Sequence, residues 1–149
     1  MPNWCLNKLT VLGSREDVQA FRDKAKGQSP WPQPKEAEQA AENPLNFHSL
    51  VPVPEQVLKS GYESAGHLWE TEHWGCKWGA AETAIVDECD GLIVYDFHTA
   101  WSPPIELLET TAKLFPALTF LLDYDEPGMA FKGIAKFKGE ASEDHCIHY

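Results

Sequence analysis

The fold of this chain is decided by the segment Glu82–Thr99, which reads ETAIVDECDGLIVYDFHT. In its second half, apolar residues alternate with their neighbours, and this period of two predicts a strand with one buried face; the alternating residues are Ile93, Tyr95 and Phe97. Glu82–Glu88 predicts the partner strand. Asp90-Gly91 lies between the two runs, and this dipeptide favours a hairpin turn because both residues tolerate positive φ. The segment therefore predicts a β-hairpin.

Before the hairpin, the chain predicts one strand and one helix. Trp4–Leu12 places Leu9 and Val11 in alternation with polar residues, which is typical of a half-buried strand. Ser14 and Asp17 then have the spacing of a helix N-cap, and Gly27 ends the helix. We expect its buried side to carry Val18, Phe21 and Ala25.

After the hairpin, the chain predicts a second helix and two more strands. Ser102 is expected to cap the helix, with Pro103 in its first position, where a missing N–H costs nothing. The expected buried stripe of this helix is Ile105, Leu108, Ala112 and Phe115. Leu118–Tyr124 and Met129–Phe137 predict strands that pair across a turn at residues 125–128.

Between the first helix and the hairpin, the sequence is more irregular. Residues 28–45 are rich in proline and polar residues and predict a surface insertion. Phe47–Pro54 carries two prolines, which favour an extended segment at an edge. Glu55–Ser60 predicts a helical turn, and Ser64–His73 predicts a short helix that turns Trp69 inward.

The order of these elements predicts an α+β fold of the split βαβ, or ferredoxin-like, type. It is β-α-β-β-α-β with an extra C-terminal strand, an antiparallel sheet and two helices on one of its faces. We expect residues 1–139 to form a single domain of this type, which 149 residues are enough to stabilise. Residues 140–149 are expected to be an acidic, mobile tail.

The formal net charge of −11 points to the kind of partner that the protein would bind. From Glu82 to Glu126 there are ten acidic residues and one base, Lys113. Such a surface repels phosphate backbones and attracts basic surfaces, although solubility alone is a second explanation. We therefore expect no direct binding of nucleic acid, and the predicted partner-binding acids are Asp87, Glu88, Asp90 and Asp96.

The cysteines and the N-terminal residues bear on where the protein resides. The four cysteines are scattered without close pairs, which favours reduced thiols in the cytoplasm. Met1-Pro2-Asn3-Trp4 has neither the basic start nor the apolar core of a signal peptide. No apolar run approaches the length of a membrane helix, so we expect a cytoplasmic protein.

Two tryptophan-rich motifs, Trp74–Gly79 and Thr99–Pro104, allow two interpretations. Their rings either pack the ends of the sheet or line a groove that binds a base, a nucleotide or a side chain of a partner. Packing is the favoured interpretation, because glycine beside tryptophan fits close ring-on-backbone contact. For the second interpretation, the pocket residues are Trp74, Lys77, Trp78, His98 and Trp101.

Other chemistries find less support in the sequence. His145, Cys146 and His148 form a dense cluster, but a structural zinc site needs paired ligands on both sides of a loop, so we expect no metal site. A thiol–imidazole pair of Cys76 or Cys89 with His98 has nothing that marks either thiol as activated. No cofactor motif is present, and we expect neither a catalytic residue nor a cofactor.

The chain also resembles a known family through three motifs, Met1–Asn7, Trp74–Trp78 and Ala100–Pro104. In sequence and in order they are similar to the YubB-type proteins of plasmids and phages. The resemblance implies a ferredoxin-like domain without an assigned activity, so no catalytic residue carries over to this chain. It also implies an origin in a mobile element, where such genes often lie among those that counter host defence.

Together these observations predict a small acidic protein-binding module of phage or plasmid origin. The expected partner is a host or defence protein with a basic surface, which the module would occupy as an inhibitor. The alternative is a small-molecule or nucleotide-binding domain with a tryptophan-lined pocket. A homodimer formed through the last strand is a further expectation, because that strand can be a sheet edge.

Overall fold

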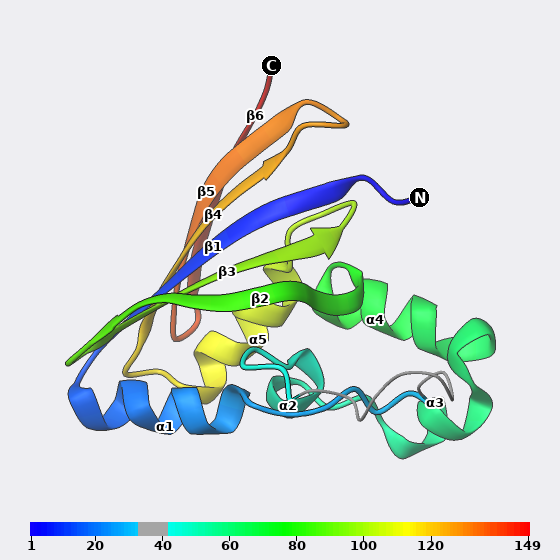
Figure 1. Cartoon of the computed structure of the whole chain (residues 1–149), viewed down its shortest axis with the longest axis horizontal. Coiled ribbons are helices and arrows are strands. Elements are labelled where there is room, and N and C mark those ends of the chain that lie inside the picture. Colours follow the sequence, from blue (N-terminus) through cyan, green and yellow to red (C-terminus); the bar gives the residue numbers. More distant parts are fainter. Residues whose placement is uncertain (33–41) are drawn as a thin grey trace.

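The computed structural model describes residues 1–32 and 42–149. Within these residues one antiparallel sheet has the strand order β2-β3-β1-β4-β5-β6 (Figure 1). Its strands are β1 (Trp4–Leu12), β2 (Lys77–Cys89), β3 (Leu92–Ala100), β4 (Thr119–Glu126), β5 (Phe131–Lys138) and β6 (Ala141–His148).

The helices lie together on one face of this sheet, below it in Figure 1. They are α1 (Arg15–Ala25), α2 (Phe47–Leu50), α3 (Glu55–Ser60), a π-helical turn η1 (Tyr62–Gly66), α4 (His67–Trp74) and α5 (Ile105–Leu114). None of these described helices is long and apolar enough to cross a membrane.

The predicted ferredoxin-like arrangement is confirmed in the first four strands. The order β2-β3-β1-β4, with α1 after β1 and α5 after β3, is that of a split βαβ fold. The central hairpin turns at Gly91, whose φ of 79° lies in the left-handed region. A Cβ at Gly91 would meet the carbonyl oxygen of Gly13 at 2.7 Å, so the residue that turns the hairpin also lets β1 end beside it.

The core lies between the sheet and the helices, where the period of two predicted it. Tyr95 and Phe97 from β3 and Leu9 from β1 are almost fully buried. Phe21 from α1 packs edge-on against Tyr95 and Phe120, with ring centroids 6.2 and 5.4 Å away. Burial of each such side chain contributes roughly 1.5–3 kcal/mol, and this layer therefore fixes which face of the sheet stays open.

The N-terminus of α1 is capped as predicted, whereas the start of α5 is different. Ser14 Oγ accepts a hydrogen bond from the Asp17 N–H at 3.1 Å. Ser102 does not cap α5, and Pro104 holds the cap position without a side-chain hydrogen bond. Ser102 Oγ instead donates to the carbonyl of Gly75 at 2.5 Å, which ties the two tryptophan motifs to each other. The buried residues of α5 are Leu107, Leu108, Thr111 and Ala112.

Two segments differ from the prediction in their secondary structure. Residues 47–50 are the short helix α2 rather than an extended segment, because Asn46 caps them by accepting from the Ser49 N–H. Residues 141–148 are the strand β6 rather than a tail, so the sheet has two strands beyond the ferredoxin-like core. All eight residues of β6 are exposed, which removes the alternating burial by which a strand is recognised.

Part of the predicted insertion, residues 33–41, lies outside the described residues. The residues on either side of these are partly buried. Leu45 is buried, and the indole N–H of Trp31 donates to the Glu70 carboxylate at 2.9 Å. The flanks of the insertion therefore pack on the helical layer.

Candidate functional site

The open face of the sheet carries two rows of side chains that cross five strands. Both rows follow from the strand register, because residues directly opposite one another share a face. One row consists of His98, Leu6, Asp125, Lys132 and Ile147. The second row consists of Asp96, Lys8, Asp123, Ile134 and His145.

A hollow of about 810 Å³ lies over these two rows, and we call it the open-face hollow. Three exposed aliphatic side chains line it, Leu6, Ile134 and Ile147. Among the charged residues of the lining, acids outnumber bases: Glu82, Asp96, Asp123 and Asp125 against Lys8 and Lys132. The hollow thus combines apolar contact area with negative charge.

The charged groups of this hollow differ in the partners that they have within the chain. Lys8 Nζ lies 3.1 Å from Asp96 Oδ1, and the Tyr149 hydroxyl donates to Asp125 Oδ1 at 2.6 Å. Asp123 is exposed and has no ion pair or side-chain hydrogen bond with the residues that the structure describes. A positive group entering the hollow would therefore meet Asp123 as an available carboxylate.

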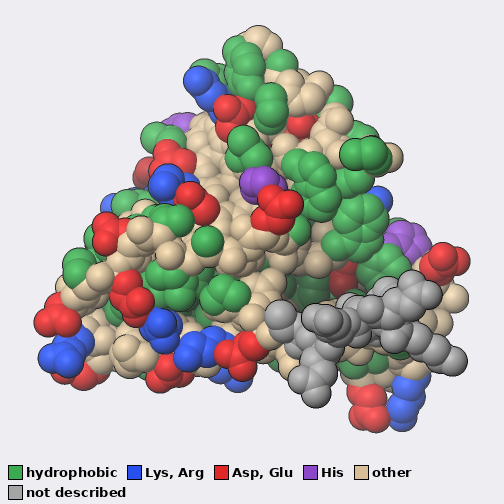
Figure 2. All heavy atoms as spheres, viewed as in Figure 1, with side chains coloured by type: hydrophobic (Ala, Val, Ile, Leu, Met, Phe, Trp, Pro, Cys, Tyr) green, Lys and Arg blue, Asp and Glu red, His purple; other side chains and the backbone are tan. Residues whose placement is uncertain are grey.

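An aromatic corner, made of Trp4, Trp78 and His98, adjoins the hollow at His98. The ring of Trp4 lies 6.4 Å from that of Trp78 and 6.4 Å from that of His98. Lys77 Nζ lies 4.3 Å from the Trp78 ring centroid, at the range of a cation–π contact. Figure 2 shows a hydrophobic area beside a histidine near the middle of this face.

A second hollow, of about 470 Å³, continues from the aromatic corner toward the turn after β4. It shares Leu6, Glu82 and His98 with the open-face hollow. Glu82 Oε2 lies 3.4 Å from His98 Nδ1 at the junction. The recessed surface therefore extends from the outer strands to the N-terminal end of β1.

The backbone around this corner is strained. Trp78, Glu82 and Trp101 have φ values of 74°, 50° and 71°, in the left-handed region that bulky residues rarely adopt. Each such residue costs on the order of 1–3 kcal/mol, and such strain clusters at functional sites. The chain holds Trp78 in place through its N–H, which donates to Glu70 Oε1 at 2.8 Å.

Glu70 is the buried anchor of this strained segment. Its carboxylate accepts from the Trp78 N–H and from the Trp31 indole, and none of its surface is exposed. Burial raises the pKa of Glu70, while the hydrogen bonds from Trp78 and Trp31 oppose that shift. One side chain therefore joins α4, the start of β2 and the flank of the insertion.

The structure separates the tryptophans of the predicted pocket. Trp74 is only 3 % exposed; its indole N–H donates to the Val51 carbonyl, and its ring packs edge-on against Phe47. Trp78 is 50 % exposed and lies with Lys77 and His98 at the aromatic corner. Trp74 thus packs the core, whereas the other two motif tryptophans, Trp78 and Trp101, expose their rings to solvent.

Trp101 is fixed by its backbone rather than by its ring. Its N–H donates to the carbonyl of Asn3 at 2.8 Å, directly after the last residue of β3, and its side chain is 43 % exposed. Ser102, the next residue, does not cap α5, so Trp101 does not position a helix cap. Its backbone bond instead continues the pairing of β3 with β1.

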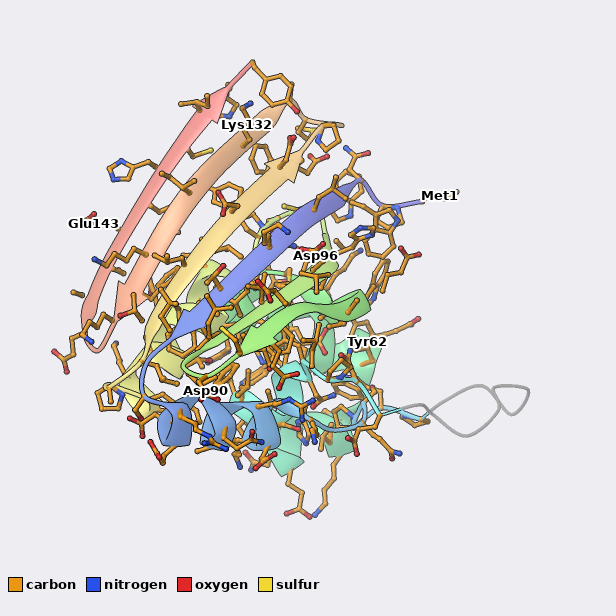
Figure 3. All side chains as sticks on the ribbon, turned by 60° about the vertical axis from the view of Figure 1, so that its left-hand side comes forward. Met1, Tyr62, Asp90, Asp96, Lys132 and Glu143 are labelled. Carbon is orange, nitrogen blue, oxygen red and sulfur yellow. The ribbon has the colours of Figure 1, made fainter. Side chains whose placement is uncertain are left out.

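The four acids predicted as a partner-binding surface do not share one face. Glu88 forms an ion pair with Arg22 of α1 at 2.6 Å, on the side of the helices, whereas Asp96 pairs with Lys8 on the open face. Asp90 lies at the hairpin turn beside α1, 3.7 Å from Arg15, and away from Asp96 (Figure 3). Asp87 lies opposite Val94 on the open face.

Three of these four acids therefore have a basic partner within the chain. Figure 2 shows the resulting mixture of acidic and basic side chains at the lower left of the molecule, over α1. Of the four, Asp96 alone lines the open-face hollow. The acids of the predicted region are present in the sequence, but the structure distributes their charges over several sides of the hairpin.

The geometry also bears on the thiols and imidazoles considered above. Burial raises the pKa of Cys76 well above its ordinary value and that of Cys5 to about 12, so both remain thiols at neutral pH. Cys89 lies opposite Leu92 at the turn, and His98 lies opposite Ala81 near the other end of the hairpin. Among the described residues, no group of three or more His, Cys, Asp and Glu side chains could hold a metal ion.

Several residues of the site were not predicted from the sequence. Trp4 and Leu6 belong to the exposed side of β1, and neither was among the predicted site residues. Ile147 lies on the strand that was expected to be a tail. The alternation in Trp4–Leu12 contained the signal for the first two, because Leu6 and Trp4 lie two and four positions before Lys8 and must share its face.

Comparison with known proteins identifies a family domain that contains every strand of this site except β1. Residues 67–148, which contain β2 to β6, match the family described as the ferredoxin-like domain in Api92-like protein. A crystal structure of the protein Api92 from Yersinia pseudotuberculosis is similar in fold over 100 % of this chain and 98 % of that chain, with a TM-score of 0.76 and 11 % sequence identity. No curated protein matches the sequence of this chain.

Proposed function

This chain belongs to the Api92-like family through its ferredoxin-like domain, and we propose that the domain is a protein-binding module. It captures a partner on the open face of its sheet, in the open-face hollow and against the aromatic corner. The observation that carries this proposal is the combination of exposed aliphatic side chains with an excess of acids in one hollow.

The lining of the hollow defines the chemistry of the partner. Leu6, Ile134 and Ile147 offer apolar contact area, which drives association once water is excluded. Asp123 and Asp125 lie between them and favour positive groups. Electrostatic complementarity of this kind sets the specificity of binding and the rate of encounter. The proposed ligand is a segment in which lysine or arginine alternates with aliphatic residues.

The strain at the aromatic corner supports the same assignment. Trp78 at this corner, and Trp101 at the end of β3, expose large rings on a backbone that glycine would adopt at lower cost. Tryptophan is among the residues that contribute most to protein interfaces. Exposed tryptophans that are retained at a cost in stability favour a contact with a partner over a role in packing.

The biological setting that we propose follows from the resemblance to YubB-type proteins. A protein of plasmid or phage origin that acts in the host cytoplasm would meet host and defence proteins, many of which present basic surfaces to nucleic acid. By occupying such a surface this module would act as an anti-defence inhibitor. The acidic lining of the hollow disfavours phosphate, so direct binding of nucleic acid is not part of the proposal.

The alternative is a tryptophan-lined site for a nucleotide or another small molecule. The cavity that Trp74 and Trp78 line has a volume of about 230 Å³, below the roughly 300–1,000 Å³ of most ligand pockets. Glu70 lies in its wall and would repel a phosphate. This alternative therefore has less support, and stabilisation of the protein by nucleotides in a thermal-shift screen would favour it.

Selection from a random-peptide display library tests the proposed function. Wild-type protein is the bait, and the enriched peptides are synthesised and titrated against it at low and high salt. We expect lysine or arginine to alternate with aliphatic residues in these peptides. Their affinity should fall with salt, because exposed charges are screened.

Two double variants locate the binding site. Asp123→Lys with Asp125→Lys reverses the charge of the hollow and should weaken binding at least tenfold. Asp87→Lys with Asp90→Lys makes the same charge change at the hairpin, outside the hollow, and should change affinity less than threefold. Equal binding by the hollow variant, or enrichment of acidic peptides, would contradict the proposal.

A further inference from the structure

Strand β6 is an edge strand whose two faces are both exposed. All eight residues of Ala141–His148 are exposed, and within the described residues β6 pairs with β5 alone. Figure 3 shows Lys132 and Glu143 on these outermost strands, away from the helices. Edge strands normally carry bulges, prolines or a cover that blocks further pairing.

The two edges of the sheet differ in this respect. Strand β2, at the opposite edge, has register shifts between Lys77 and Ala81, between Ala81 and Ala84, and between Ile85 and Asp87. Strand β6 pairs with β5 in an unbroken register from Ala141 to His148. The edge at β2 is therefore irregular, whereas the edge at β6 is regular enough to accept another strand.

The hydrogen bonds of β6 identify the backbone groups that face away from the sheet. The N–H of Tyr149 donates to the Ala130 carbonyl at 2.8 Å, so residue 149 and its alternate neighbours bond toward β5. The intervening residues of an antiparallel strand direct N–H and C=O outward. These outward residues of β6 are Ser142, Asp144, Cys146 and His148.

The chain holds this edge strand firmly in place. The Tyr124 hydroxyl of β4 donates to Asp144 Oδ1 at 2.6 Å, across the intervening strand β5. The Tyr124 side chain can reach across β5 because Gly133 lies opposite Tyr124. A Cβ at residue 133 would collide with the tyrosine hydroxyl. The free edge is therefore ordered by a specific contact.

The charge at this edge permits a second copy to approach. Although the chain has a formal net charge of −11, the side chains of residues 131–149 carry equal numbers of lysines and acids. These are Lys132, Lys136 and Lys138 against Glu140, Glu143 and Asp144. The excess negative charge thus lies elsewhere, and the side chains of residues 131–149 add no net charge repulsion between two copies.

We propose that β6 pairs antiparallel with β6 of a second copy of this chain, around a two-fold axis at Cys146. A two-fold axis perpendicular to the sheet pairs residues of the same face, so an isologous contact follows. In this register Asp144 of each copy lies opposite His148 of its partner, and His145 lies opposite Ile147. The outward backbone groups at 144, 146 and 148 meet their counterparts.

Neighbouring registers are less favourable. An axis at Asp144 places that carboxylate opposite its own copy, and an axis at Glu143 does the same for Glu143, so like charges oppose each other. An axis at His145 pairs no opposite charges. The axis at Cys146 gives two Asp144–His148 pairs, in each of which an imidazole lies opposite a carboxylate.

The dimer would also enlarge the candidate binding site. His145 and Ile147 of β6 line the open-face hollow, and the two-fold axis keeps the open faces of both copies on one side. The two hollows would then adjoin across the new pair of strands. This gives a partner with two basic segments a bivalent surface, whereas the pairing itself does not depend on any partner.

Sedimentation velocity of the full chain across a dilution series tests the pairing without any ligand. We expect wild type to sediment as a dimer that dissociates on dilution. His148→Asp would place two acids opposite each other and should weaken dimerisation at least tenfold. His145→Asp is the matched control, and it should dimerise as wild type does, because its counterpart is Ile147.

Disulfide trapping supplies a second, independent measurement. In a Cys89→Ser background, diamide should convert the two Cys146 thiols to a cross-strand disulfide by taking up two electrons and two protons, and a covalent dimer should appear on a non-reducing gel. Added Cys146→Ser should abolish that band. A monomer at every wild-type concentration, or dimerisation that is lost in His145→Asp and kept in His148→Asp, would overturn the proposal.

Discussion

At the scale of single residues, the tryptophans show how similar sequence contexts lead to different roles. Trp74 and Trp78 each have a glycine as their next neighbour, yet one ring is buried and the other is half exposed. The difference arises at Gly75, where α4 ends in a left-handed conformation and β2 starts soon after. The sequence alone could predict that the rings mattered, but not which of them would face solvent.

Alanine substitutions should separate these two roles. Trp74→Ala removes a buried ring and its hydrogen bond to Val51, and it should destabilise the protein by about 3–5 kcal/mol. Trp101→Ala keeps the backbone bond to Asn3 and should cost under about 1 kcal/mol. Urea denaturation of both variants measures the difference. Equal losses of stability would show that Trp101 is also a packing residue.

Glu70 should give the protein a measurable pH dependence. Burial raises the pKa of Glu70 above its ordinary value of 4.5, so the folded state binds a proton more tightly than the unfolded state. Wild-type stability relative to Glu70→Gln should therefore be highest below pH 4.5 and should fall as pH rises through the raised pKa.

Unfolding free energies of wild type and Glu70→Gln at several pH values measure this difference. Gln keeps one acceptor for the Trp78 N–H, so the variant is expected to fold. An Asp87→Asn variant, altered at an exposed acid, serves as the control. A constant difference across the pH range would contradict the role of Glu70.

At the scale of elements, most of the helices and strands that pack on the core were predicted, whereas the short helix α2 and the outermost strand were not. The stretches 4–12, 92–99 and 118–124 were recognised because one side of each strand is buried, so that apolar residues recur at every second position. In β6 no residue is buried, so its sequence carries no such period. The short helix α2 was missed because Pro52 and Pro54, just beyond it, suggested an extended segment.

The contact that anchors β6 makes it testable as an element. Tyr124→Phe removes the hydroxyl that donates to Asp144 and should cost about 1 kcal/mol, with the effect concentrated in β6. Hydrogen exchange of the amides in residues 141–148 should become faster, while that of β1 stays slow. Tyr149→Phe, which removes an exposed hydroxyl bond to Asp125, is the control and should have the smaller effect.

At the scale of the whole molecule, the arrangement separates stability from recognition. The helices cover one side of β2, β3, β1 and β4, and this layer holds the core (Figure 1). The other side of the sheet keeps the open-face hollow, with charges and aliphatic groups that packing does not require. Composition predicted an acidic protein, but it could not predict that ion pairs with Arg15, Arg22 and Lys8 would engage much of the hairpin's charge.

A binding surface of this kind should trade stability for function. Asp123 lies on β4, where aspartate is a poor strand residue, next to the aliphatic side chain of Ile134. Asp123→Val should raise the free energy of unfolding by up to about 1 kcal/mol and should weaken binding of the selected basic peptides. Thermal denaturation and a peptide titration of the same sample check both effects. A variant that is less stable and binds equally well would contradict this trade-off.

The central claim is that the open-face hollow binds a basic, partly aliphatic segment, and amide chemical-shift mapping by NMR tests it most directly. A peptide of alternating lysine and leucine is titrated into labelled protein, with an alternating glutamate and leucine peptide as the control. The account predicts shifts concentrated at Leu6, Asp123, Asp125, Ile134 and Ile147 with the basic peptide alone. Shifts confined to the helices, or no shifts at the hollow, would contradict it.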